Sequence, residues 1–172
     1  MICPQLYIRN TNSGSRIIHG NQIRSIAGRR TKAYPGPSLP HIWPAPGVTG
    51  QPLTKRRVAL ITTAGLHRRG DAPFGVGAAD YRVVPSGIPA NELVMSHIST
   101  NFDRSGFQQD WNVVFPLDRL WELAEEKVIG SVAGYHYSFM GATDPVRMES
   151  AARGLARILK NDGVDAVLLV PV

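Results

Sequence analysis

The chain has 172 residues, of which 43% are apolar, which suits one domain with a core of ordinary size. Its apolar runs are far shorter than the roughly 20 residues that a membrane-spanning helix needs, and no secretory stretch follows Met1, so we expect a cytoplasmic protein. The formal net charge is +6, and the single cysteine, Cys3, excludes an internal disulfide and a thiolate set for zinc or an iron–sulfur cluster.

The first 50 residues differ from the rest in charge and composition. Eleven of the 19 basic residues precede Asp71, the first acidic residue, and the segment is rich in glycine, proline, serine and asparagine. Without a helical or strand period, residues 1–50 are predicted to be a disordered leader. A nucleic-acid arm, an organelle transit peptide and translated non-coding sequence would each explain its basic charge, and the last is favoured. The folded domain is expected over residues 51–172.

Four strands are predicted between the leader and the first helix. Residues 57–63 form a nearly continuous apolar run that ends in an Ala-Gly pair, as expected for a strand buried on both faces of a parallel sheet. Shorter strands are predicted over residues 81–85, 93–98 and 112–115, the first two separated by a turn that contains two prolines.

Two helices follow in the predicted order. The first covers residues 117–128, where apolar side chains recur at helical spacing, with Lys127 in its last turn and Gly130 placed to cap its end. The second has Asp144 as its N-cap and Pro145 at the first helical position, and it ends at an Asn-Asp-Gly turn.

A buried strand over residues 164–171 follows the second helix directly. A helix, a glycine turn and a buried strand form the second half of a βαβ crossover, which favours a parallel sheet with helices over its faces. The predicted fold is therefore α/β, a Rossmann-like or flavodoxin-like, mostly parallel sheet with flanking helices. Because an α/β enzyme would present its next functional loop after this strand, we expect the sheet to be incomplete at the C-terminus.

Ligands of such sheets collect at the carboxyl ends of the strands, where three polar segments are expected. They are residues 62–67, the strand end at His97, and residues 135–141 between the two helices. None matches a dinucleotide fingerprint, a P-loop or a metalloprotease helix. His97 is a candidate acid–base residue, because the carboxylate of nearby Asp103 would orient the imidazole and raise its pKa.

The other histidines have plainer interpretations beside the functional one. His67 stands beside two arginines, as expected of a solvated loop residue, and His136 lies between two tyrosines, as in a packed aromatic cluster. The histidines could bind metal only together with Asp103 and Asp110, and the required helical or hairpin spacing is missing. No metal site is predicted.

Four segments are long enough to indicate a family. They are Val58-Ala-Leu-Ile-Thr-Thr-Ala-Gly-Leu-His67, Asn112-Val-Val-Phe-Pro-Leu-Asp-Arg-Leu120, His136-Tyr-Ser-Phe-Met-Gly141 and Asp162-Gly-Val-Asp-Ala-Val-Leu-Leu-Val-Pro-Val172. Together they resemble the glycine/sarcosine/betaine reductase selenoprotein B family, which includes the D-proline reductase selenoprotein subunit. The resemblance covers residues 40–172, and we recognise no counterpart for residues 1–39.

This resemblance implies reductive cleavage of a carbon–nitrogen bond in a substrate such as glycine, betaine, sarcosine or D-proline. A partner chain would hold the substrate on a pyruvoyl group, and a selenocysteine or cysteine of this subunit would attack the α-carbon as its anion. In the family that residue follows the strand matched by residues 167–172, so we expect it just after Val172. A selenocysteine codon read as a stop would end the chain there. Such a chain would lack its nucleophile and is expected to be inactive alone.

The resemblance also suggests which residues form the site. The expected catalytic residues are His97, Asp103 and His136, and the expected substrate-binding residues are Thr63, His67, Tyr137 and Ser138. The expected partners are a pyruvoyl-containing reductase subunit, a small amino-acid or amine substrate and further copies of the chain, without nucleic acid or membrane. Two alternatives stay open: a non-catalytic α/β binding or assembly domain, and a cofactor-free enzyme of the racemase or lyase type.

Overall fold

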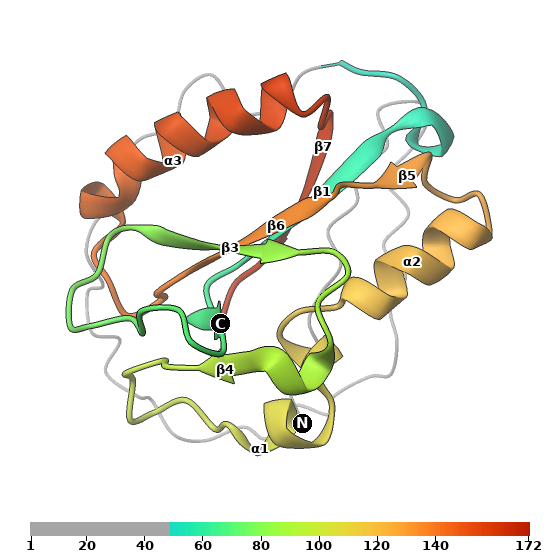
Figure 1. Ribbon diagram of the computed structural model, residues 1–172. Coiled ribbons are helices and arrows are strands. Elements are labelled where there is room, and N and C mark those ends of the chain that lie inside the picture. The colour runs from blue at the N-terminus through green and yellow to red at the C-terminus, as the bar shows by residue number, and fades with distance from the viewer. Residues whose placement is uncertain (1–48) are drawn as a thin grey trace, which may run out of the picture. The chain divides into compact units, whose positions relative to one another are not determined.

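The computed structural model describes residues 49–172 (Figure 1). The predicted leader up to residue 48 and Cys3 lie outside the described residues. The strands are β1 Arg57–Thr62, β2 Leu66–Arg68, β3 Tyr81–Pro85, β4 Leu93–Met95, β5 Ser131–Val132, β6 Tyr135–Phe139 and β7 Ala166–Val170. The α-helices are α1 Ser105–Gln109, α2 Leu117–Glu125 and α3 Pro145–Asn161, and the 3-10 turns are η1 Leu53–Lys55, η2 Ala90–Glu92 and η3 Trp111–Val113.

A mixed sheet of five strands is built around β1. On one side β1 pairs in parallel with β7 from Val58 to Thr62, and on the other it pairs in parallel with β5 near its start and β6 near its end. β3 lies antiparallel to β6, and β2 and β4 form a separate antiparallel pair. The predicted α/β fold with a mostly parallel sheet is thus confirmed.

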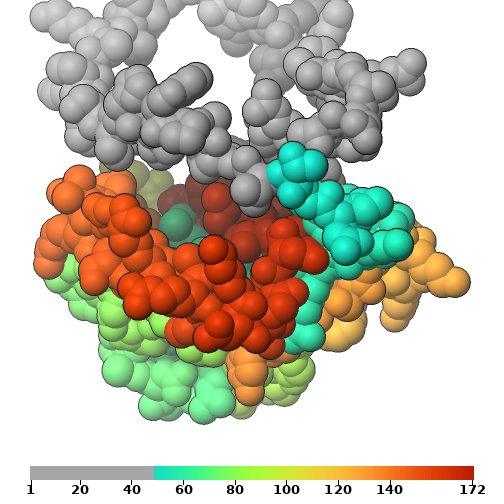
Figure 2. Space-filling model, turned by 90° about the horizontal axis from the view of Figure 1, so that it is seen from above, coloured from blue at the N-terminus to red at the C-terminus, as the bar shows by residue number. Residues whose placement is uncertain are grey.

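Apolar side chains alternate between the two faces of this sheet. On β1, Val58 and Leu60 join the core beneath α2, whereas Ala59 joins the core beneath α3. Figure 1 shows α3 along one face and α2 with β4 and α1 toward the other, and Figure 2 shows the side chains of α3, in orange and red, along its own face. Since β1 is buried on both faces, its continuous apolar run is what a central parallel strand requires.

The predicted start of α3 is confirmed in detail. The Asp144 carboxylate accepts a hydrogen bond of 3.0 Å from the Val146 N–H, and Pro145 occupies the first turn. Leu155 and Leu159 then lie buried against the sheet, as the spacing of the apolar residues indicates. Within residues 49–172 no helix combines the length and the apolar composition needed to cross a bilayer.

The predicted strand over residues 112–115 is wrong, because this segment begins with the turn η3. The Asp110 carboxylate accepts from the Asn112 N–H at 2.9 Å, and the Asn112 side-chain oxygen accepts from the Asp118 N–H at 3.1 Å. Trp111 Nε1 also donates to the Asp118 carboxylate at 2.9 Å. These local bonds satisfy the backbone at the start of α2 and compete with strand pairing.

The end of α2 also differs from the prediction. The helix ends at Glu125, and Lys127, predicted in its last turn, has the left-handed conformation with a φ of 58°. Gly130 does not cap the helix. It allows a close approach instead, since a Cβ at this position would lie 2.5 Å from the Lys55 carbonyl carbon.

Candidate functional site

Three parallel strands meet at their carboxyl ends around Thr63, the residue that follows β1. The Gly141 N–H, beyond β6, donates to the Thr63 carbonyl oxygen at 2.8 Å. The Val172 N–H, beyond β7, donates to Thr63 Oγ1 at 2.8 Å, and the Thr63 N–H donates to the Val170 carbonyl oxygen at 3.1 Å. The chain segments that a parallel sheet uses to bind ligands are therefore joined at one residue.

Gly141 makes the close approach of these segments possible. A Cβ at this position would lie 2.7 Å from the main-chain oxygen of Val172 and 2.9 Å from that of Thr63. Both neighbours are main-chain oxygens, and that of Thr63 is held by the Gly141 N–H. A side chain at position 141 would therefore displace the Val172 oxygen, the Thr63 oxygen or both.

His97 reaches the same edge of the sheet through Gly65. Gly65 has a φ of +66°, and its carbonyl oxygen accepts from the Ser96 N–H at 3.0 Å. A Cβ at position 65 would lie 3.1 Å from the main-chain nitrogen of His97. The same Cβ would lie 3.0 Å from Cε of Met140, which follows β6. Gly65 and Gly141 were not predicted as site residues. Each lies within three residues of the end of a strand, and that is the signal that could have indicated them.

The imidazole of His97 is buried, and one of its nitrogens has no partner. Nδ1 accepts a hydrogen bond of 3.2 Å from the Ser99 N–H, so in the neutral ring the hydrogen is assigned to Nε2. Nε2 is buried and has no hydrogen-bond partner within residues 49–172. Burial, and secondly the charge of Arg104, hold the pKa of His97 below its ordinary value. His97 thus presents a neutral N–H donor.

The expected pairing of Asp103 with His97 is wrong. The Asp103 carboxylate is exposed and accepts from the Ser105 N–H at 2.9 Å. That hydrogen bond lowers the pKa of Asp103, and the pKa of His97 is lowered instead of raised. The charged neighbour of His97 is a cation, Arg104, whose guanidinium donates to the His97 carbonyl oxygen.

His136 lies inside the sheet at the break between β5 and β6. The Leu60 N–H donates to His136 Nδ1 at 3.0 Å, so the hydrogen of the neutral ring is on Nε2, which lies 2.8 Å from Ser86 Oγ. Ser86 Oγ in turn donates to the Ala133 carbonyl oxygen. Both ring nitrogens are occupied, and burial lowers the pKa of His136 to about 4. This geometry favours a structural role, and a catalytic role stays a prediction.

The aromatic cluster expected around His136 is also different from the prediction. Tyr135 is exposed, and Tyr137 points to the opposite face of β6, toward α3, where its ring makes an edge contact of 5.5 Å with Tyr81. His136 instead contacts the ring of Phe115, with centroids 5.9 Å apart. Residues 135–139 therefore form strand β6 of the sheet, and residues 140 and 141, which follow it, lie at the carboxyl edge.

The remaining predicted substrate-binding residues are also engaged in the fold. Ser138 Oγ accepts from the Leu66 N–H at 2.7 Å, and burial raises the pKa of Tyr137. His67 is not a solvated loop residue but a buried member of β2, paired with Val94 of β4. Its Nδ1 lies 2.9 Å from the Arg68 carbonyl oxygen, and its Nε2 is buried without a partner in the described chain.

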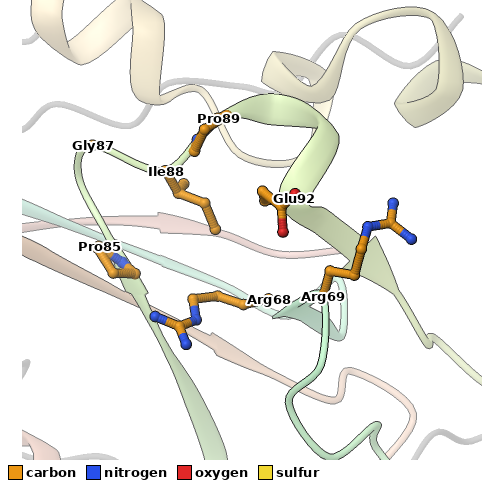
Figure 3. A pocket seen from close by; sticks show the side chains of 7 residues that line it. All are labelled: Arg68, Arg69, Pro85, Gly87, Ile88, Pro89 and Glu92. Carbon is orange, nitrogen blue, oxygen red and sulfur yellow. The ribbon is translucent and has the colours of Figure 1, made fainter.

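Two clefts on the surface of the described residues contain none of the predicted site residues. One, of about 380 Å³, is lined by Arg68, Arg69, Pro85, Gly87, Ile88, Pro89 and Glu92 (Figure 3). Since Pro85 pairs with Tyr135 at the start of β6, this cleft lies toward the end of β6 that is opposite to Gly141. Its arginines are engaged with the protein: Arg69 donates to the Asn91 carbonyl oxygen at 2.9 Å, and Arg68 lies 3.5 Å from Asp71.

The second cleft, of about 470 Å³, lies between the β4 side and the α1–η3 segment. It is lined by residues such as Phe107 of α1, and by Trp111 and Asp118, which are hydrogen-bonded to each other at the start of α2. Within the described part of the chain, no group of three or more histidine, cysteine or carboxylate side chains is arranged to hold a metal ion. The carboxyl edge at Thr63 is therefore the candidate site, because the segments that follow β1, β6 and β7 meet there.

Comparison with known proteins identifies the family of the chain. The model of the glycine/sarcosine/betaine reductase selenoprotein B family matches residues 11–172. The chain belongs to this family. The match begins at residue 11, so the expectation that residues 1–39 have no counterpart is wrong for residues 11–39. Translated non-coding sequence does not explain that span, and whether it forms a leader stays a prediction.

Three curated relatives are named as subunits of reductases. The D-proline reductase subunit gamma of Acetoanaerobium sticklandii is 33% identical over 156 residues, which are 87% of this chain and 61% of the relative. The glycine reductase complex component B subunit gamma of Symbiobacterium thermophilum is 30% identical, over 86% of this chain and 35% of the relative. The sarcosine reductase complex component B subunit beta of Peptoclostridium acidaminophilum is 29% identical, over 79% and 32%.

The chain therefore spans about three-fifths of the first relative's length and about a third of the other two. No solved structure gives a significant match.

Proposed function

We propose that the chain is part of a subunit of an amino-acid or amine reductase, which cleaves the carbon–nitrogen bond of a substrate of the glycine, betaine, sarcosine or D-proline type. The observation that carries this proposal is the family match over residues 11–172. The relatives are named for reductases of D-proline, glycine and sarcosine, so the bond type is common to them while the substrate differs.

The nucleophile, a selenocysteine or cysteine, would directly follow Val172 in the longer subunit. The bonds of the carboxyl edge support this placement, because the Val172 N–H is bonded to Thr63 Oγ1 and the absence of a side chain at Gly141 lets the Val172 main chain approach. The chalcogen anion would form a bond to the α-carbon as the carbon–nitrogen bond breaks and the nitrogen leaves with its bonding pair. One thiol of a dithiol would then attack the chalcogen, so that the carbon leaves with the electron pair and takes a proton. The second thiol would release the chalcogen as its anion and leave the dithiol oxidised to a disulfide.

Of the predicted catalytic residues, His97 is the one that the geometry supports best. Its main chain lies beside Gly65 near the carboxyl edge, its ring is neutral, and it holds a hydrogen on Nε2 that no described residue accepts. A neutral N–H donor can stabilise an anion at this edge or give a proton to the leaving nitrogen. Asp103 and His136 have their partners elsewhere.

The partner in this proposal is a pyruvoyl-containing chain that holds the substrate. The names of the relatives as gamma and beta subunits, two of them of complex components, support an assembly of several chains. The proposal expects a substrate carbon to be presented to the carboxyl edge of this subunit by the partner. The described residues then contribute the edge, the Val172 anchor and the His97 donor.

The test is to express the reading frame through and beyond Val172 together with its partner chain. The codon after Val172 should be UGA or a cysteine codon, followed in frame by further family sequence. With a dithiol and each of the four substrates, mass spectrometry should detect the product of carbon–nitrogen cleavage, and alanine in place of the chalcogen should lower turnover at least about 10³-fold. His97→Gln should lower it about 10²-fold or more, as loss of a proton donor does.

The outcomes separate this proposal from its main alternative. A UAA or UAG codon after Val172, or an assembled complex with no product from any substrate, would contradict the reductase proposal. Assembly without turnover would favour a non-catalytic binding or assembly domain.

A further inference from the structure

We propose that the Thr63 hydroxyl is a clamp that fixes the direction in which the chain leaves Val172, which makes Thr63 a positioning residue and not a ligand of the substrate. The inference deepens the proposed function, on which it rests, because the residue after Val172 is the nucleophile there. Its geometric part, however, concerns only residues that the structure describes.

The Thr63 hydroxyl replaces a main-chain acceptor of the regular hydrogen-bond pattern between β1 and β7. The Thr63 N–H bonds to the Val170 carbonyl oxygen, so in a regular parallel ladder the Val172 N–H would bond to the Thr63 carbonyl oxygen. That oxygen instead accepts from Gly141, on the opposite side of β1, at 2.8 Å. The Val172 N–H bonds to Thr63 Oγ1 at 2.8 Å, so the hydroxyl takes the place of the carbonyl.

The hydroxyl also holds Val172 at two points. Oγ1 accepts from the Val172 N–H and lies 3.3 Å from the Val172 main-chain oxygen, to which it donates. Pro171, the residue before it, has no N–H and cannot donate a main-chain hydrogen bond. The last anchor of the chain before position 173 is therefore one side-chain oxygen.

Gly141 closes the clamp from the other side. The position of its absent Cβ is 2.7 Å from the Val172 main-chain oxygen and 3.1 Å from Thr63 Oγ1. Val172 thus lies against backbone on one side and against the hydroxyl on the other. A side chain at position 141 would occupy the space in which these two atoms meet.

Together these contacts set the orientation of whatever follows Val172. A reacting group must be held within about 0.5 Å of its productive position, and a misplacement of about 1 Å can cost about 10²-fold in rate. A residue anchored only by a free chain end would not meet that requirement. The Thr63 hydroxyl supplies the constraint through its contacts with the Val172 main chain.

The direct test uses the chain as it exists and measures hydrogen exchange of single amides by NMR. Thr63→Val keeps the size of the side chain and removes the hydroxyl, so the Val172 amide should exchange about tenfold faster. Thr63→Ser keeps the hydroxyl and should leave that rate close to the wild-type value. The Leu168 amide, inside β7, is the internal control for an intact sheet.

Two outcomes overturn the clamp. One is an unchanged Val172 exchange rate in Thr63→Val, and the other is an equal increase in Thr63→Val and Thr63→Ser, which would indicate packing and not the hydroxyl. If Thr63→Val loses protection at Leu168 as well, Gly141→Ala takes its place as the test variant. Its methyl group should displace Val172 and accelerate exchange at that amide with Leu168 still protected, and an unchanged rate would again overturn the proposal.

A second measurement connects the clamp to the reaction. In the longer subunit, with its partner and with a chalcogen after Val172, Thr63→Val should lower kcat about 10- to 100-fold with little change in KM, and Thr63→Ser should restore most of it. If Thr63→Val raises KM and leaves kcat unchanged, Thr63 is a ligand of the substrate, and the positioning role is overturned. If no variant has any turnover, the proposed function fails, while the amide exchange still decides the clamp.

Discussion

His136 shows how a single buried residue links sheet geometry to pH. Its neutral ring joins the Leu60 N–H to Ser86 and bridges the break between β5 and β6. Protonation would place a hydrogen on Nδ1, where the Leu60 N–H already points, and would charge a ring that burial keeps at a pKa of about 4. Between pH 6.5 and pH 4, His136 is therefore protonated in the unfolded chain, where its pKa is 6.5, but stays neutral in the folded protein.

We expect the free energy of unfolding to fall as the pH is lowered from 6.5 to 4. The contribution of His136 is fully present above pH 6.5 and lost near pH 4, and a shift of this size corresponds to about 3 kcal/mol at most. Urea unfolding at a series of pH values measures it. His136→Asn keeps an acceptor for Leu60 without titrating, so it should flatten the slope, leaving the smaller share of His97. An equally steep slope in His136→Asn would contradict the assignment.

At this scale the sequence indicated which residues are near the strands but not what they bind. His136 and Leu60 are 76 positions apart, and the break that the imidazole fills exists only after β5 and β6 have both paired with β1. His67 next to two arginines looked exposed, yet its backbone pairing with β4 buries it. Such partners depend on tertiary pairing, which local composition does not encode.

At the scale of elements, the start of α3 offers a quantitative test of the sequence interpretation. Asp144→Ala removes the acceptor for the Val146 N–H and should lower the free energy of unfolding by about 1 kcal/mol. Asp144→Ser keeps a capping oxygen and should restore most of that loss. Urea denaturation curves of the two variants give the difference.

The matched control is Glu149→Ala on the same helix. It removes an exposed ion pair with Arg153 and should change stability by no more than about 0.5 kcal/mol. An equal loss in Asp144→Ala and Glu149→Ala would contradict the capping role.

Elements with strong local signals were predictable, and those governed by side-chain contacts were not. The capping residue, proline and apolar period of α3 all act within one segment, so its bounds follow from the sequence. Residues 112–115 have the composition of a strand, but the Asp110 carboxylate accepts from the main-chain N–H of Asn112 and the Asp118 carboxylate accepts from its side-chain amide. The convergence at Thr63 was foreseeable only as a general property of carboxyl edges, because the bonds to Gly141 and Val172 join residues far apart in the chain.

At the scale of the whole molecule, the sheet has an apolar edge at β7. Among the described strands β7 pairs only with β1, and its five residues contain no charge and no proline. Val167 is 41% exposed and Leu169 is 66% exposed. A fully apolar strand is typical of the middle of a parallel sheet, whereas edge strands usually carry charges or prolines that prevent pairing with other chains.

We therefore expect residues 1–172, expressed alone, to self-associate through β7. Leu169→Lys places a charge on the exposed face of that strand and should lower the associated fraction in sedimentation velocity, while the free energy of unfolding changes by less than about 0.5 kcal/mol. Val76→Lys is the matched control, because Val76 is 92% exposed but lies in a loop without strand hydrogen bonds to offer. If both substitutions reduce association equally, general surface charge is responsible; if neither does, the β7 edge does not pair between copies.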